Sequence, residues 1–135
     1  MVGKAKDNAG AQPAIGPGLT PGVVPVPEVI VVLTNVPDLN LGKRLAHVLL
    51  EEGLAACVNL GAPMLSMYRW QNAIAGDEEI PLVIKSTADR QQALCQAIVR
   101  LHPYEVPEVV VLPVAGGLPA YLQWVHQETR APLHG

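Results

Sequence analysis

Groups that could carry out chemistry are concentrated in the seven residues His102-Pro103-Tyr104-Glu105-Val106-Pro107-Glu108. An imidazole and two carboxylates are side chains that bind metal ions or transfer protons near neutral pH. The prolines fix their own φ angles and bias His102 and Val106 toward extended backbone, which predicts a stiff connector. Two interpretations stay open: an acid/base pair formed by Glu105 and Glu108, or surface carboxylates that serve as ion-pair partners.

Two side chains are candidate metal ligands, Cys57 and His102. A thiolate selects Cu(I), whereas imidazole suits Cu(II) or zinc. We expect His102 to be exposed because it ends a helical pattern and precedes a proline, although a histidine there also stabilises the helix dipole. Cys57 lies beside alanines in an apolar run, so a buried core thiol is the alternative. Without a CxxC, HxxxH or HExxH pattern, a copper or other divalent site should be weak, with ligands assembled by folding or by neighbouring subunits.

The remaining candidates would line a cleft between subunits. Nearly all of the aromatic surface belongs to four side chains: Tyr68, Trp70, Tyr104 and Trp124. They either pack at a subunit seam or line a cleft for a small ligand. Lys85, at the end of an apolar strand, is a candidate partner for Glu105 or Glu108 across subunits. No Gly-x-Ser-x-Gly motif or phosphate-binding glycine loop occurs, and we predict a protein that is not an enzyme.

Apolar runs and turn residues predict the elements that must position these groups. We expect strands at residues 29–33, at 54–60 with a resumption at 64–70 after a bend, at 80–86 and at 109–112. Residues 71–79 should form an exposed hairpin loop. One helix should run from Asp38 or Asn40 to Gly53, a second from a Ser86 or Thr87 cap to Pro103, and a third after Pro119.

This order is β-α-β-β-α-β with an additional C-terminal helix, an α+β arrangement of a four-stranded sheet with two helices on one face. The first and last strands alternate too little for a sheet with one wet face. Two helices cover only one face, so we infer that another subunit covers the other.

Composition limits the class of protein. The chain has 135 residues, two cysteines and a net charge of −3, with basic residues scattered almost singly. These features predict one domain, no nucleic-acid partner and a reducing, cytoplasmic location. We expect a disordered Pro/Gly-rich tail over residues 1–27 with no membrane span, a folded domain over 28–130 and a flexible C-terminus over 131–135.

Short motifs, in order along residues 29–129, together resemble the CutA family of divalent-cation tolerance proteins: Leu54-Ala55-Ala56-Cys57-Val58-Asn59, Ser66-Met67-Tyr68-Arg69-Trp70, Ile84-Lys85-Ser86, the connector 102–108 and Tyr121-Leu122-Gln123-Trp124. The resemblance implies a ferredoxin-like subunit that forms a tight homotrimer, is related in architecture to PII signalling proteins, and is associated with copper binding and tolerance. It also implies that the connector lies beside an inter-subunit cleft. Members usually carry a glycine and often a basic residue where Asn72 and Ala73 stand. Because Asn tolerates positive φ, we expect the turn to form.

Two functions follow as expectations. The first is a trimeric divalent-cation tolerance protein that binds copper or another divalent ion without turnover. The alternative is a PII-like sensor that binds a small ligand between subunits and signals to an unidentified protein or small-molecule partner.

Overall fold

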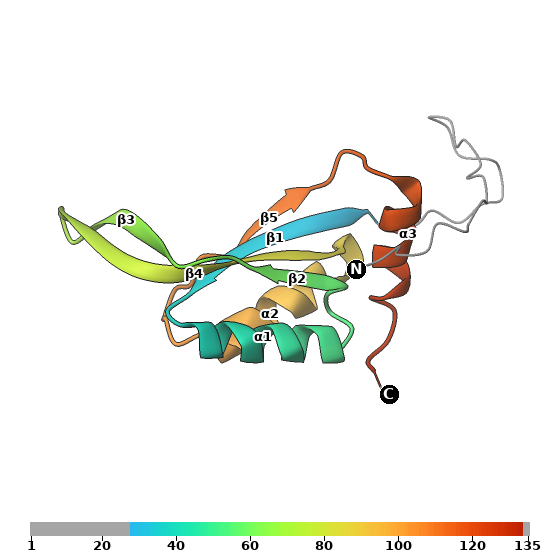
Figure 1. The fold of residues 1–135 in the computed structure, drawn as a ribbon, viewed down its shortest axis with the longest axis horizontal. Helices are drawn as coiled ribbons and strands as arrows, with labels where there is room; N and C mark the ends of the chain where they lie inside the picture. The colour runs from blue at the N-terminus through green and yellow to red at the C-terminus, as the bar shows by residue number, and fades with distance from the viewer. Residues whose placement is uncertain (1–27, 134–135) are drawn as a thin grey trace.

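The computed structural model describes residues 28–133 and contains, within them, a five-stranded antiparallel sheet with two helices packed on one face (Figure 1). The strands are β1 (Val29–Val36), β2 (Cys57–Leu60), β3 (Met64–Trp70), β4 (Ala73–Thr87) and β5 (Val110–Pro113). The helices are α1 (Leu39–Glu51), α2 (Gln91–Leu101) and α3 (Pro119–Gln127), with a 3-10 turn (Ala88–Arg90) ahead of α2. Residues 1–27, for which we predicted a tail, lie outside the described part.

The sheet order is β2-β4-β1-β5, and β3 pairs with the first half of β4. This is the predicted α+β, ferredoxin-like arrangement with an additional C-terminal helix, and it is confirmed. In Figure 1 the β3–β4 hairpin projects beyond α1 and α2 as an arm, whereas α3 lies at the opposite end of the sheet.

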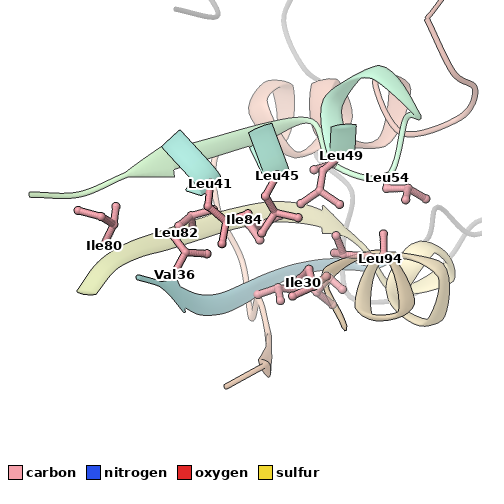
Figure 2. Packing of buried hydrophobic residues seen from close by; sticks show 14 residues of the cluster. Ile30, Val36, Leu41, Leu45, Leu49, Leu54, Ile80, Leu82, Ile84 and Leu94 are labelled. Carbon is pink, nitrogen blue, oxygen red and sulfur yellow. The ribbon is translucent and has the colours of Figure 1, made fainter. Parts of the chain in front are cut away.

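The hydrophobic core lies between the sheet and the helices α1 and α2 (Figure 2). It is aliphatic, as a chain without phenylalanine requires. Leucine, isoleucine and valine side chains from both layers interdigitate there, and they include Val32, Val36, Leu45, Leu49, Leu82, Ile84, Leu94 and Ile98. Burial of these side chains is the main stabilising contribution to the fold.

The ends of α1 follow the sequence signals. The Asp38 side chain accepts a hydrogen bond from the Leu41 backbone N–H at 2.8 Å, so Asp38 is the N-cap. Gly53 has φ +70° just after the helix, as a left-handed C-terminal residue should. An ideal Cβ built on Gly53 would lie 2.4 Å from the Ala131 carbonyl oxygen, so the site also requires glycine for space.

The predicted hairpin loop over residues 71–79 is wrong. The turn consists of Gln71 and Asn72 alone, both with positive φ (49° and 66°), and β4 begins at Ala73. Cross-strand pairing along the whole of β3 therefore overrides the weak strand propensity of the polar stretch after the turn. The expectation that Asn72 supports the turn is confirmed.

Three smaller boundaries also differ. β2 starts at Cys57 rather than at residue 54, although Leu54 is buried, and β5 runs from Val110 to Pro113. Ser86 does not cap α2, because its hydroxyl donates to the Leu54 carbonyl oxygen at 2.6 Å. The nearby Thr87 hydroxyl donates to Asp89 instead, at 2.6 Å.

The face of the sheet away from α1 and α2 is only partly covered within residues 28–133. The strand register aligns Leu112, Val31, Lys85 and Cys57 in one row and Val110, Leu33, Val83 and Asn59 in the next. Leu112 and Val110 are 44% and 43% exposed, and the central apolar residues are half-buried. We refer to this surface as the open face.

Residues 130–133, after α3, are attached to the rest of the domain, although we expected a flexible C-terminus over residues 131–135. Arg130 forms a bidentate ion pair with Asp89, with N–O distances of 2.7 and 3.0 Å. The Leu133 backbone N–H donates to the Glu51 carbonyl oxygen at 2.8 Å. The domain limits at residues 28 and 130 stay a prediction.

Candidate functional site

The connector 102–108 leads from α2 to β5. We predicted that its first residue, His102, is exposed, and this prediction is wrong. His102 is 8% exposed, because its ring packs against the end of β1 and against Tyr104, with ring centroids 4.6 Å apart. His102 Nε2 lies 2.7 Å from the Asn35 carbonyl oxygen, and Nδ1 accepts a hydrogen bond from the Tyr104 N–H at 3.1 Å. A carbonyl requires a donor, so Nε2 carries the proton and donates.

Both ring nitrogens of His102 are therefore used within the fold. A metal ion needs a nitrogen lone pair, and the Nδ1 lone pair already accepts from the backbone. In this geometry His102 links the connector to β1 through hydrogen bonds, and its ring is not available as a metal ligand.

A groove of about 910 Å³ opens between the arm and the connector. One wall comes from β3 and the first half of β4, where Tyr68, Trp70, Asp77 and Glu79 share one face of the arm. The other wall comes from the connector, and the floor comes from the middle of β1 and β4. Five of the seven residues predicted for a cleft line this groove: Tyr68, Trp70, Tyr104, Glu105 and Glu108.

Two tyrosine–carboxylate pairs lie in the groove, one within the arm and one between the connector and the arm. The Tyr68 hydroxyl donates to Asp77 across the hairpin, and the Tyr104 hydroxyl donates to Glu79 at 3.3 Å. The hydrogen bond to Asp77, followed by burial and nearby carboxylates, raises the pKa of Tyr68. Burial, followed by the charge and hydrogen bond of Glu79, raises the pKa of Tyr104. Both phenols are therefore neutral donors near neutral pH.

The groove is negatively charged. Four carboxylates line it, from Asp77, Glu79, Glu105 and Glu108, and none of its lining residues in the described part of the chain is basic. The Asn35 side chain donates to Glu108 at 3.0 Å, which fixes that carboxylate without neutralising it. The arrangement favours a cationic ligand.

The other predicted residues lie at the α3 end of the open face. Cys57 is buried, and Lys85, which pairs with it in the register, donates to Asn59. The Cys57 thiol lies 3.9 Å from the same Asn59 oxygen. Burial, and after it the neighbouring Cys57, raises the pKa of Tyr121 on α3. The Tyr121 ring stacks at 5.7 Å on that of Trp124, the remaining predicted aromatic residue.

Residues 30–128 match the family model described as CutA1 divalent ion tolerance protein. The chain belongs to the CutA1 family. It is 42% identical over 99 residues to the divalent-cation tolerance protein CutA of Thermus thermophilus, covering 73% of this chain and 96% of that protein. It is 40% identical over 119 residues to mouse Protein CutA, covering 88% of this chain and 64% of the mouse protein, so it spans less than two thirds of that relative.

The solved structure of CutA1 from Oryza sativa has the same fold, with a TM-score of 0.76 and 40% sequence identity over 78% of this chain and 96% of the rice chain. The resemblance inferred from the motifs is therefore confirmed. The name of the family describes tolerance of divalent ions rather than a reaction.

In this CutA1-family domain the predicted site residues lie in two separate places, the groove and the α3 end of the open face. Lys85 lies six residues beyond Glu79 on β4, which corresponds to about 20 Å along a strand. The register places Cys57 in the row of Val31, whereas His102 contacts Asn35, four residues further along β1. The two predicted metal ligands are therefore about 13 Å apart along the strand direction. Within residues 28–133, no group of three or more His, Cys, Asp or Glu side chains is placed to hold a metal ion.

The sequence interpretation missed Asp77 and Glu79 as site residues because it assigned them to a loop. Their spacing of two residues, continued by Pro81, is the period of a strand and could have placed them on one face. None of the described helices is both long and apolar enough to cross a membrane.

Proposed function

We propose that this CutA1-family chain is a cytoplasmic, homotrimeric divalent-cation tolerance protein that binds copper or another divalent ion weakly and performs no catalytic turnover. The observation that carries the proposal is the groove at the open face, which is lined by four carboxylates and, among residues 28–133, by no basic residue. Free thiols at Cys57 and Cys95 support a reducing compartment.

The open face supports the trimer. Its rows of valine and leucine are half-buried or exposed in a single chain, although continuous apolar rows are typical of covered sheet faces. In a cyclic trimer the groove of one subunit meets a different part of its neighbour's open face. This contact would bring the groove residues close to the group around Lys85 and Trp124. Within one chain, Glu79 of the groove and Lys85 are about 20 Å apart along β4.

As ligands for a metal ion we propose carboxylates rather than the predicted pair of Cys57 and His102. His102 has no free lone pair, and Cys57 lies in a row with the ammonium-bearing Lys85. Glu105 and Glu108 supply hard oxygen ligands at the groove, and copper(II) binds a given oxygen or nitrogen site more tightly than the other first-row divalent ions. A site completed by a neighbouring subunit would be weak and exchangeable.

Copper calorimetry on the full chain tests this assignment. We expect the Glu105→Gln, Glu108→Gln double variant to bind Cu²⁺ several-fold more weakly, because each exposed charge pair contributes up to about 1 kcal/mol. The matched control is Glu51→Gln, Glu52→Gln, which removes the same charge from exposed residues at the end of α1. Identical isotherms for the two double variants would exclude the groove as the copper site.

A second candidate is the sensor that binds a small molecule between subunits. The volume and aromatic lining of the groove favour it, since ligand pockets of this size commonly combine aromatic walls with a few polar groups. A thermal-shift panel of nucleotides and small metabolites tests this candidate, and a flat response across the panel would remove it.

A further inference from the structure

We infer that the C-terminal end of α1 carries a divalent-metal site, separate from the groove, that is formed by His47, Glu51 and His134. Its ion would be one that imidazole suits, such as Zn²⁺ or Cu²⁺. The inference goes beyond the proposed function, because the site lies on the helical layer and shares no residue with the groove. His47 and Glu51 belong to α1, whereas His134 lies outside the described residues.

Two of the three donors lie close together on α1. His47 and Glu51 are four residues apart, on one side of the helix, and His47 Nε2 lies 3.1 Å from Glu51 Oε2. Two ligand atoms that bind the same ion through bonds of about 2.0–2.2 Å are themselves roughly 3 Å apart. The pair therefore has the spacing of neighbouring ligands, and a divalent ion would take the place of the hydrogen between the two atoms.

The third donor follows from the path of the chain after α3. The Leu133 backbone N–H donates to the Glu51 carbonyl oxygen at 2.8 Å, which fixes this part of the chain at the end of α1. His134 is the next residue in the sequence, and consecutive Cα atoms are only about 3.8 Å apart. We therefore add its imidazole as the third ligand. Two imidazoles and a glutamate form a set that proteins use for Zn²⁺, with water in the remaining position.

The charges at the end of α1 also favour a cation. The carbonyl end of a helix carries a partial negative charge, which basic side chains in the last turn offset. α1 has no basic residue in its last turn and ends instead with Glu51, followed by Glu52 as its C-cap. The lysine and arginine of α1, Lys43 and Arg44, lie about two turns before Glu51. A bound divalent ion would offset the negative charge that remains at this helix end.

The site stays accessible in the proposed trimer. The helices α1 and α2 pack on one face of the sheet, and the subunits would meet through the open face on the other side (Figure 1). The side chains of His47 and Glu51 are 74% and 47% exposed, whereas the buried residues of α1, such as Leu45 and Leu49, belong to the core against the sheet. A neighbouring subunit on the open face would therefore leave the two donors free.

Calorimetric titration of the full chain with Zn²⁺ tests the inference. We expect His47→Ala and His134→Ala each to weaken Zn²⁺ binding about tenfold or more, because each removes one of three ligands. The matched control is His126→Ala, which removes an imidazole from α3 and should leave the affinity unchanged.

A pair of substitutions at Glu51 separates metal ligation from charge. Glu51→Gln and Glu51→His both remove the negative charge near neutral pH, but only histidine supplies a nitrogen that binds metal ions. We expect Glu51→His to bind Zn²⁺ about tenfold more tightly than Glu51→Gln. Equal affinities within this pair, no Zn²⁺ binding by the wild type, or the same affinity in His47→Ala, His134→Ala and His126→Ala would overturn the inference.

Failure of the inference is distinguishable from failure of the proposed function. Because Glu51 belongs to this site, the copper comparison of the groove is made in a His47→Ala, His134→Ala background, where it reports on the groove alone. If the Glu105 and Glu108 substitutions weaken Cu²⁺ binding there but Zn²⁺ binding ignores the histidine substitutions, only the inference falls. If the histidine substitutions weaken Zn²⁺ binding while the groove substitutions leave Cu²⁺ binding unchanged, the inference stands and the groove site falls.

Discussion

For His102, the sequence predicts the position of the side chain along the chain but not its surroundings in the fold. The sequence predicts correctly that an imidazole lies at the junction of a helix and a proline-rich connector. It does not predict burial, because the acceptor is the carbonyl of Asn35, which is 67 residues away in the chain. Contacts over such separations are determined by the fold, so local patterns could identify the residue but not its partners.

A stability measurement tests the structural role of His102. We expect His102→Ala to lower the free energy of unfolding by about 1–3 kcal/mol, because it leaves the Asn35 carbonyl and the Tyr104 N–H without partners. Urea unfolding measures this change. His47→Ala is the control, since His47 lies on the exposed side of α1 with 74% of its side chain accessible. Unchanged stability together with lost copper binding would show that His102 is a ligand instead.

At the scale of elements, the strands and helices were predictable where periodicity and capping agree. Asp38 and Gly53 bracket α1 as their types require, and the apolar stripe of α2 is buried at Leu94 and Ile98. The arm was not predictable from composition, because Gly76 and its acidic neighbours have low strand propensity and are held by pairing with β3. The wall of the groove that the arm forms was therefore not predicted either.

Gly53 tests the end of α1. We expect Gly53→Ala to destabilise the protein by about 1–3 kcal/mol, because its φ is +70° and the new Cβ would meet the Ala131 carbonyl. Gly116→Ala is the matched control, since no atom lies within 4 Å of its Cβ position, and it should be neutral or slightly stabilising. Thermal unfolding compares the two, and equal midpoints would contradict the described packing of residue 131.

The ion pair of Asp89 and Arg130 gives a pH dependence. The hydrogen bonds from Arg130 lower the pKa of Asp89 from 3.8 to about 2. A lowered folded-state pKa stabilises the fold above the unfolded value of 3.8, and this contribution disappears as the pH falls through about 2. Both side chains are more than a third exposed, so the contribution is about 1 kcal/mol or less.

We therefore expect Asp89→Asn to be less stable than the wild type at pH 7, by a difference that shrinks as the pH falls from about 4 toward 2. Chemical unfolding across this range measures the difference. Glu128→Gln, at an exposed residue after α3, serves as the control. A difference that persists unchanged to pH 2 would contradict the assignment of the effect to the ionised carboxylate.

At the scale of the whole molecule, the sequence predicts a sheet face that the two helices leave uncovered. The register gives that face its residues, with Val31, Leu33, Val110 and Leu112 in two adjacent rows. A contiguous apolar surface on a sheet face is typical of an interface with another chain. The number of subunits that we propose, three, comes from what the resemblance to the CutA family implies.

Light scattering of the full chain at low concentration, in the presence of a chelator, tests this account most directly. We expect about 43 kDa, three times the 14.3 kDa of one chain, because apolar burial rather than a metal ion would hold the subunits together. A mass of one chain under these conditions would contradict it, since the open face would then be a free surface and the groove would have to act alone.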